Sequence, residues 1–248
     1  MNIGISTEVR TENRNYDRVL DLVKAGFKYI EINNNITRVR FKDINSLVEL
    51  RKKKKLTYSF HSLVKNLFCP DKIISDAEYN FIKGELRLAA LTGAQRLIFH
   101  IAKKDQLDTE ERKKLLSLLK IAKSYKIKLC LENNSSNGAF AGDYLINVLN
   151  EYDDLFLCLD TGHLNIANNN GQIKNIDSFL DQLKNKIIHL HISYNNGFKD
   201  QHLSLNKRGS DYVKRILDYL NHKNISAIIE TKNFKLAIKT QVILKNLY

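Results

Sequence analysis

The chain has 248 residues, which suits one α/β barrel or two small domains, and its 43% hydrophobic residues are ordinary for a globular protein with a sizeable core. Only one proline, Pro70, and no Pro/Gly/Ser-rich linker interrupt the pattern, so we expect a single domain over residues 1–248. No apolar run approaches the ~18 residues of a membrane span, and the first residues lack the long apolar segment of a secretory signal. These features predict a cytoplasmic protein with no membrane partner.

The net charge of +13 invites a nucleic-acid interpretation. However, the densest cationic run, residues 51–55, is expected between a helix and the next strand, which in a β/α barrel is the face opposite the active site. Cations near the negative end of a helix dipole explain this run better than a binding patch does. The three cysteines are widely spaced, and Cys130 and Cys158 fall in predicted buried strands, so we expect reduced thiols and no disulfide.

Apolar runs typical of buried strands alternate with helical patterns along the whole chain. The predicted strands are 3–6, 27–32, 56–61, 95–101, 127–132, 155–160, 186–192 and 225–230. The predicted helices are 15–25, 43–53, 75–91, 108–125, 144–150, 176–183, 210–220 and 236–247, with Ser75 and Glu78 as a capping box. Short apolar strands separated by helices favour a parallel sheet with right-handed crossovers. Eight such units predict an α/β fold of the (β/α)8 TIM barrel type. A doubly wound open sheet is the alternative, but no Gly-rich phosphate loop follows the first strand.

Acidic or imidazole side chains stand at the C-terminal ends of the third to the eighth predicted strands, where β/α barrels carry their catalytic groups. Buried and unpaired, such groups would be strongly destabilising, so their recurrence in register indicates a functional site. Five histidines and four carboxylates make up the set: His61, His100, Glu132, Asp160, His163, His191, Asp200, His202 and Glu230.

Mixed imidazole and carboxylate ligands suit Zn²⁺, Mn²⁺ or Fe²⁺ better than Mg²⁺ or Ca²⁺, and no cysteine lies at a strand end. Nine ligands could hold more than one metal if a carboxylate bridges two of them. In one arrangement a bridging Glu132 has His61 and His100 on one side and Asp160, His191 and Glu230 on the other, and a third site takes His163, Asp200 and His202. His189 is expected one layer deeper than His191, and we assign it to the core.

Six phrases occur in order along the chain: FHS, IFH, LCLENN, CLDTGH, HLHISYNNGFKDQHLSL and IIET. With them the sequence resembles the xylose-isomerase-like superfamily of metal-dependent barrels over essentially its whole length. Two branches of that superfamily fit. One is the sugar isomerase/epimerase branch, which includes D-tagatose 3-epimerase and inosose-pathway enzymes. The other is the apurinic/apyrimidinic endonuclease branch of the endonuclease IV type.

Resemblance to the isomerase branch implies one divalent metal, Zn²⁺ or Mn²⁺, held by Glu132, Asp160, His191 and Glu230. Glu132 and Glu230 would then be catalytic, exchanging a proton with a sugar or sugar phosphate through an ene-diolate. Resemblance to the endonuclease branch implies that all nine residues bind up to three zinc ions, with Glu132 bridging. The substrate would then be abasic DNA, cleaved as a phosphodiester.

The nine ligand positions do not separate the two branches, whereas other features favour the isomerase. The loops expected above the barrel are short for an enzyme that must hold a flipped-out nucleotide, and Val64 stands where the endonuclease pattern has a tyrosine. The phrasing HLHxxxNNGxxDxHL is also closer to the isomerase-like proteins. Against both branches, Tyr194 replaces a usual aspartate and residues 206–209 replace a Gly-x-Gly turn.

Four further residues are predicted to bind substrate. Glu31 matches a glutamate of sugar isomerases that lies near the substrate. Lys103, Lys199 and Lys232 follow the fourth, seventh and eighth predicted strands, where they could hold a sugar phosphate or a DNA backbone, or could form a generic lysine-rich surface. We therefore predict a sugar or sugar-phosphate isomerase/epimerase, with an abasic-site endonuclease as the alternative and an inactive binding module as a third interpretation. The oligomeric state stays open.

Overall fold

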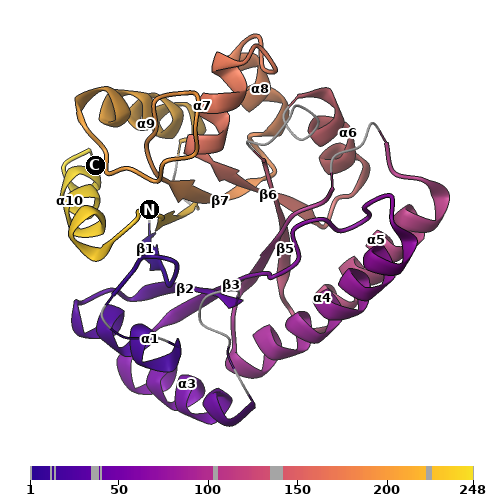
Figure 1. Ribbon diagram of the computed structural model, residues 1–248, viewed down its shortest axis with the longest axis horizontal. Coiled ribbons are helices and arrows are strands. Elements are labelled where there is room, and N and C mark those ends of the chain that lie inside the picture. Colours follow the sequence, from indigo (N-terminus) through magenta and orange to yellow (C-terminus); the bar gives the residue numbers. More distant parts are fainter. Residues whose placement is uncertain are drawn as a thin grey trace.

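The computed structural model describes residues 2–247 except 12, 14, 35–38, 40, 103–105, 135–141 and 222–224. Eight parallel strands pair in chain order and close into a barrel, with the last strand paired to the first. Helices surround this barrel on all sides (Figure 1). The predicted (β/α)8 barrel is therefore confirmed, and the open sheet is excluded.

The strands are β1 (Asn2–Ser6), β2 (Tyr29–Asn33), β3 (Thr57–His61), β4 (Arg96–Phe99), β5 (Lys128–Glu132), β6 (Leu155–Asp160), β7 (Ile187–Ile192) and β8 (Ser226–Ile229). The helices of the described residues are α1 (Asn15–Lys24), α3 (Phe41–Lys54), α4 (Lys72–Thr92), α5 (Thr109–Ser124), α6 (Asp143–Glu151), α7 (Thr161–Asn169), α8 (Ile176–Leu183), α9 (Lys207–Leu220) and α10 (Phe234–Lys245). The bounds of β6 match the predicted ones, and the ends of the other strands differ from them by at most two residues.

Two apolar clusters show how the barrel is filled. The larger cluster lies between the strands and the helices, and it includes Leu97 and Phe99 of β4. The smaller cluster consists of Ile98, Cys130 and Cys158. Since successive side chains of a strand point to opposite faces, Ile98 points into the barrel, away from the helices. Nearer the C-terminal ends of the strands, the side chains that point into the barrel are polar. They form the site described below.

Helix ends explain two departures from the sequence prediction. α4 begins three residues before Ser75, because the Asp71 side chain accepts hydrogen bonds from the backbone N–H groups of Ile73 and Ile74. The predicted Ser75 capping box is therefore wrong. α7 was not predicted, since its sequence TGHLNIANN is rich in weak helix formers. It begins here because Asp160, at the end of β6, accepts a 2.6 Å hydrogen bond from the N–H of His163.

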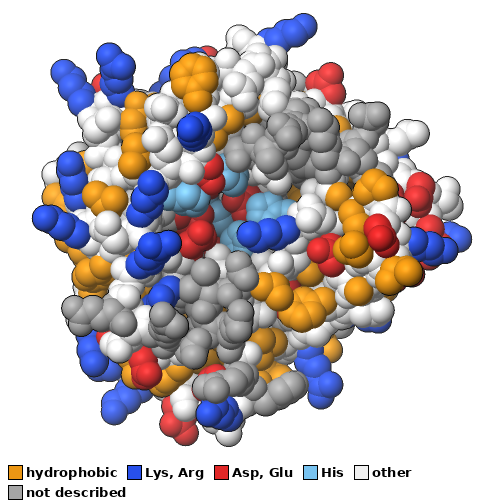
Figure 2. Space-filling view, viewed as in Figure 1, with side chains coloured by type: hydrophobic (Ala, Val, Ile, Leu, Met, Phe, Trp, Pro, Cys, Tyr) orange, Lys and Arg blue, Asp and Glu red, His pale blue; other side chains and the backbone are white. Residues whose placement is uncertain are grey.

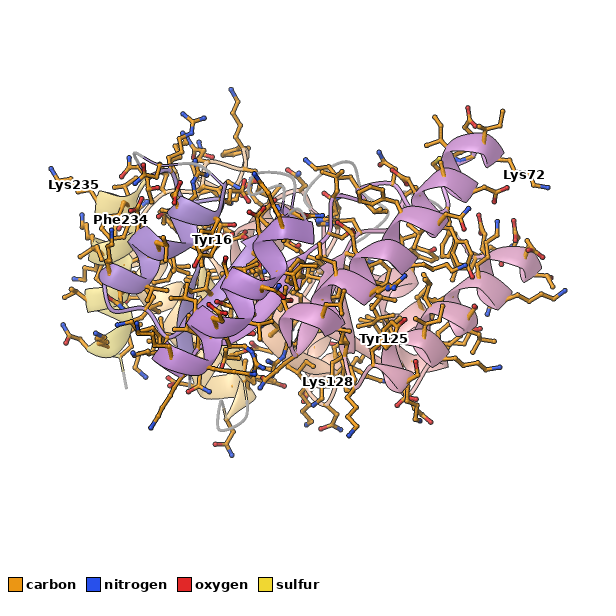
Figure 3. All side chains as sticks on the ribbon, turned by 90° about the horizontal axis from the view of Figure 1, so that it is seen from below. Tyr16, Lys72, Tyr125, Lys128, Phe234 and Lys235 are labelled. Atoms are coloured by element: carbon orange, nitrogen blue, oxygen red, sulfur yellow. The ribbon has the colours of Figure 1, made fainter. Side chains whose placement is uncertain are left out.

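The two ends of the barrel carry different segments of the chain. Lys72, at the start of α4, lies at one end of the molecule, whereas Tyr125, just after α5, and Lys128, at the start of β5, lie at the other (Figure 3). In the cationic run of residues 51–55, the first four residues form the last turn of α3 and Lys55 precedes β3. The run therefore lies at the N-terminal end of the strands, as predicted. No described helix is long and apolar enough to cross a membrane, and all three cysteines are free thiols.

Gly4 of β1 leaves no room for a side chain, so it provides a test of barrel packing. A Cβ at Gly4 would collide with the carbonyl oxygen of Tyr29 and lie 2.8 Å from Cδ1 of Ile228. We expect Gly4→Ala to lower the free energy of unfolding by about 1–3 kcal/mol, because neighbouring strands must move. Chemical denaturation measures this change.

Gly84 provides the matched control, because a Cβ there would meet nothing within 4 Å in the middle of α4. Gly84→Ala should raise the free energy of unfolding by about 0.5–1 kcal/mol through its effect on helix propensity. Equal stabilisation by both substitutions would contradict the tight β1–β2 packing.

Candidate metal centre and active site

A cavity of about 350 Å³ opens at the C-terminal ends of the strands. Seven of the nine predicted ligand residues line it: His61, His100, Glu132, His163, Asp200, His202 and Glu230. The other two, Asp160 and His191, are buried at its floor, with exposed fractions of 1% and 0%. Figure 2 shows the histidines and acidic side chains gathered in a hollow at the centre of this face, with lysine and arginine side chains around it. The structure therefore brings all nine residues to one place.

Glu132 is the residue on which the histidines converge. Its Oε2 lies 2.9 Å from Nε2 of His61 and 3.3 Å from Nε2 of His100. Its Oε1 lies 3.2 Å from Nδ1 of His191 and 3.5 Å from Nδ1 of His163. The two oxygens thus face different sets of imidazoles, which is the arrangement that a bridging carboxylate requires.

The ligand atoms of Glu132, Asp160, His191 and Glu230 form the most compact group, and all of them lie within 4.8 Å of one another. Nδ1 of His191 lies between the two glutamates, 3.2 Å from Oε1 of Glu132 and 3.4 Å from Oε2 of Glu230. One nitrogen and three carboxylates, placed on or directly after four different strands, can enclose a divalent cation. We call these four residues the central cluster.

Two further groups lie on either side of the central cluster. His61, His100 and Glu132 have ligand atoms within 4.8 Å of one another. On the other side, Oδ2 of Asp200 lies 3.3 Å from Nε2 of His163 and 2.9 Å from Nε2 of His202. The side chains therefore fall into the three groups that the sequence suggested.

Backbone carbonyls orient three of these imidazoles. Nδ1 of His61 lies 3.1 Å from the carbonyl oxygen of Ser62, and Nδ1 of His163 lies 2.8 Å from that of Asn133. Nδ1 of His202 lies 3.1 Å from the carbonyl oxygen of Glu230. Because a carbonyl only accepts, each Nδ1 carries the proton and each Nε2 is directed into the site.

Burial and neighbouring charges push the pKa values of the two central glutamates apart. For Glu132 burial favours the neutral acid, but the charges of His191 and His100, together with hydrogen bonds from His191 and His61, outweigh it and hold the pKa well below its usual range. For Glu230 burial dominates and raises the pKa to about 8, with the nearby Glu8 and Glu132 charges adding to the effect. In the metal-free chain Glu132 is therefore ionised and Glu230 is protonated at neutral pH.

The histidines beside Glu132 also differ from each other. Burial opposes protonation of His61, but the hydrogen bond and charge of Glu132 prevail and raise its pKa to about 9. For His100 burial prevails, and its pKa falls to about 3 despite the charge of Glu132. One buried neutral imidazole and one imidazolium therefore share the same carboxylate oxygen.

The central cluster fits a divalent cation. Oδ2 of Asp160 and Oε1 of Glu230 are buried and have no hydrogen-bond partner among the residues that the structure describes. Unpaired carboxylate oxygens of this kind are costly in a protein interior, and a cation enclosed by the cluster would satisfy both. Oxygen and imidazole donors are the ligands that Zn²⁺ and Mn²⁺ accept.

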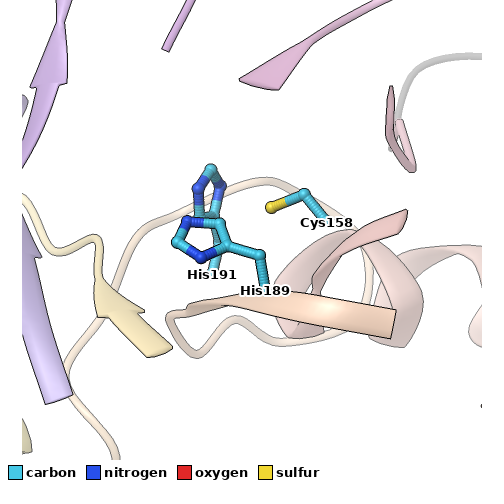
Figure 4. Close-up of side chains that lie close together, drawn as sticks. All are labelled: Cys158, His189 and His191. Carbon is cyan, nitrogen blue, oxygen red and sulfur yellow. The ribbon is translucent and has the colours of Figure 1, made fainter. Parts of the chain in front are cut away.

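Cys158, His189 and His191 lie close together below the central cluster (Figure 4). Burial raises the pKa of the Cys158 thiol well above its usual range, so in the metal-free chain this sulfur is a neutral thiol. Nε2 of His189 and Nε2 of His191 each lie 2.9 Å from Glu31. This group is therefore part of the barrel interior, as predicted for His189, and not a second metal site.

The structure does not support the predicted substrate contact of Glu31. Its carboxylate is fully buried beneath the cavity, where it contacts His189 and His191. Lys199 and Lys232 are exposed and do not line the cavity. Lys103 lies outside the described residues.

Several polar residues that line the cavity are not among the predicted site residues: Glu8, Asn33, Ser62, Lys65, Asn66 and Asn134. Each follows or ends a strand, so the rule that located the histidines could also have found them. However, most of these side chains are uncharged, and the charged ones do not belong to a recurring pattern, so the sequence did not indicate a functional role for them. Glu8 is held by Asn33, whose Nδ2 donates a 3.1 Å hydrogen bond to Oε2 of Glu8.

A family model described as a xylose isomerase-like TIM barrel matches residues 19–245. The chain belongs to this family. Among solved structures, a D-tagatose 3-epimerase-like protein superposes with a TM-score of 0.83 at 23% identity, covering 100% of this chain and 97% of that one. The IolI protein with a bound zinc atom superposes with a TM-score of 0.77 at 18% identity, covering 100% and 98%. At these identities the likeness establishes the fold of the family.

One curated relative, an uncharacterised protein of Methanocaldococcus jannaschii, is 27% identical over 94% of this chain and 93% of its own length. Two other curated relatives match over shorter segments. Another uncharacterised protein of Methanocaldococcus jannaschii is 30% identical over 53% of this chain and 46% of its own length. A probable endonuclease 4 of Mycoplasma pneumoniae is 29% identical over 61% of this chain and 59% of its own length. The matched segments thus span about half the length of these two relatives. The family therefore contains relatives with different names, and the comparisons alone do not fix the reaction.

The His163–Asp200–His202 group predicts proton release when a metal binds. Burial lowers the pKa of both imidazoles, but the nearby carboxylates prevail and raise each pKa to about 10. Since an imidazole must lose a proton to bind a metal, affinity for Zn²⁺ should fall as the pH falls, by roughly tenfold per pH unit for each proton released.

Titration calorimetry at about pH 6 and about pH 8, in two buffers of different ionisation enthalpy, measures this effect. His202→Asn should reduce the number of protons released by one. A binding enthalpy independent of the buffer would contradict the raised pKa values.

Proposed function

We propose that the protein is a divalent-metal-dependent sugar or sugar-phosphate epimerase or isomerase. The observation that carries this proposal is the pair Glu132 and Glu230, which flank Nδ1 of His191 and whose pKa values are shifted in opposite directions. In the metal-free chain these opposite pKa shifts leave Glu132 as a base and Glu230 as an acid at the same pH. Such a pair is what proton exchange at a carbon atom requires.

The chemistry divides between the two glutamates. A Zn²⁺ or Mn²⁺ ion held by Glu132, Asp160, His191 and Glu230 would polarise a substrate carbonyl and so acidify the neighbouring C–H bond. Glu132, which is ionised, accepts the proton from one face of that carbon. Glu230 donates a proton to the opposite face, which inverts the configuration. The burial of both groups keeps water from competing for the proton.

The cavity supports a small polyhydroxylated substrate. Its volume of about 350 Å³ falls within the range of small-molecule sites. Asn33, Asn66, Asn134 and Glu8 line it and offer both donors and acceptors to hydroxyl groups. That structural neighbours are named as epimerases of tagatose and ribulose agrees with this substrate class. A zinc atom in the IolI neighbour agrees with the metal.

Proton exchange gives the direct test of this function. Zinc- or manganese-loaded protein should exchange the α-proton of a ketose or ketose phosphate for deuterium in D₂O, followed by proton NMR. Glu132→Gln and Glu230→Gln should each lower the exchange rate by about 10²- to 10⁴-fold, because each removes a group that transfers a proton. Glu49→Gln, on the exposed surface of α3, is the control and should keep the wild-type rate.

Absence of exchange with every ketose and ketose phosphate tested, in a protein that binds metal, would contradict the proposal. Full activity of Glu132→Gln would contradict the assigned roles. In either case the metal centre itself would remain open to separate measurement by elemental analysis.

A second candidate function is abasic-site endonuclease. It is favoured by the convergence of all nine ligand residues into three adjacent groups and by the relative named probable endonuclease 4. Inside the cavity, Lys65 is the one lysine or arginine among the described lining residues, which suits a small substrate better than a DNA backbone; the other cations of this face lie around the opening (Figure 2). About three zinc ions per chain together with nicking of an abasic duplex would establish this function in place of the epimerase.

A further inference from the structure

A second carboxylate lies inside the barrel, one layer below the central cluster. Glu31 of β2 is fully buried, and so are the two histidines that it contacts, His189 and His191. These histidines belong to the same strand, β7, and point to the same side of it, with Cys158 of β6 beside them (Figure 4). The substrate cavity does not reach Glu31, so its role must be exerted through its neighbours.

The two oxygens of Glu31 have separate partners. Oε2 accepts a 2.8 Å hydrogen bond from Oγ of Ser59 and lies 2.9 Å from Nε2 of His189. Oε1 lies 2.9 Å from Nε2 of His191. An ionised carboxylate only accepts hydrogen bonds. Neither Nε2 of His191 nor Oε1 of Glu31 has a hydrogen-bond partner among the described residues, and each has the other as its 2.9 Å neighbour. When Nδ1 binds a cation, the one proton of the His191 ring therefore belongs on Nε2, facing Glu31.

His189 is itself fixed from the opposite end of the barrel. Its Nδ1 lies 2.7 Å from Oγ of Ser226, and Tyr29 OH lies 3.4 Å from the same nitrogen. Nη1 of Arg96 donates a 3.2 Å hydrogen bond to Tyr29 OH. Because this chain of contacts reaches His189 from below, neither its ring nor the Glu31 carboxylate is free to turn away from His191.

His191 is oriented differently from the other histidines of the site. His61, His163 and His202 each direct Nδ1 to a backbone carbonyl and Nε2 into the site. His191 directs Nε2 away from the site, to Glu31, and Nδ1 into the central cluster. It is the only one of these four whose outer nitrogen faces a carboxylate. A carboxylate in this position both fixes the tautomer and strengthens the imidazole as a metal ligand more than a carbonyl does.

We propose that Glu31 is a positioning residue for the metal centre: it holds the proton of His191 on Nε2, so that Nδ1 presents a lone pair to a divalent cation in the central cluster. This inference rests on the metal centre of the proposed function. It replaces the substrate contact predicted for Glu31. It also gives His189 a role, since His189 keeps the Glu31 carboxylate in place.

Zinc affinity is the first readout. Competition with a chromophoric chelator should show that Glu31→Gln binds Zn²⁺ about 10- to 100-fold more weakly than wild type. Glu31→Asp keeps the charge on a shorter side chain and should recover part of the loss. Glu111→Gln is the matched control, because Glu111 is a buried carboxylate at the start of α5 that belongs to a capping box, and its zinc affinity should stay within twofold of wild type.

The tautomer of His191 is the second readout, and it needs no substitution. Nitrogen NMR of the histidine rings in zinc-loaded wild-type protein should show His191 protonated at Nε2 and bound through Nδ1. In Glu31→Gln the same ring should lose this fixed tautomer. A role of Glu31 in barrel stability alone would alter the unfolding temperature but neither the tautomer nor the zinc affinity.

Two results would overturn the inference. One is a His191 ring protonated at Nδ1 in the zinc-loaded wild type, which can be observed even if Glu31→Gln fails to fold. The other is a zinc affinity of Glu31→Gln within twofold of wild type. A wild-type protein that binds no Zn²⁺ would overturn the metal centre and this inference together. Zinc binding that depends on Glu31, without proton exchange on any sugar, would overturn the proposed reaction alone.

Discussion

The buried negative charge of Glu132 is the constraint on which the centre of this protein depends. An isolated carboxylate in an apolar interior is strongly destabilising, and here four imidazoles within 3.5 Å of its oxygens offset that cost. Those imidazoles come from strands or strand ends on both sides of β5. Closure of the barrel brings them together, so the pairing of the strands and the chemistry of the site depend on each other.

Charge is arranged in two layers along the barrel axis. The upper layer contains the central cluster, and the lower layer contains Glu31 and His189. His191 joins them, because its Nδ1 faces Glu132 and Glu230 while its Nε2 faces Glu31. A cation in the upper layer would replace protons that the metal-free chain carries on its histidines. Metal binding, proton release and the orientation of one imidazole are therefore parts of a single equilibrium.

The same centre is compatible with two chemistries, proton transfer on a sugar and phosphodiester hydrolysis, and the fold does not choose between them. The surroundings of the metal centre distinguish the two chemistries. A cavity lined by asparagines and Glu8 suits hydroxyl groups, whereas cations are sparse among the described residues that line it. Opposite pKa shifts of Glu132 and Glu230 suit a base and an acid. These two properties are the physical grounds on which the epimerase is preferred.

The sequence by itself determined the barrel and the nine clustered residues, because apolar runs, their alternation with helices and the position at a strand end are local properties of the chain. It did not determine the role of Glu31, since a glutamate in an apolar strand looks the same whether it faces substrate or two histidines from β7. The start of α7 and the tautomers of the histidines also needed the structure. Only closure of the barrel places a side chain of β2 against one of β7, and partners so distant in sequence leave no local pattern to read.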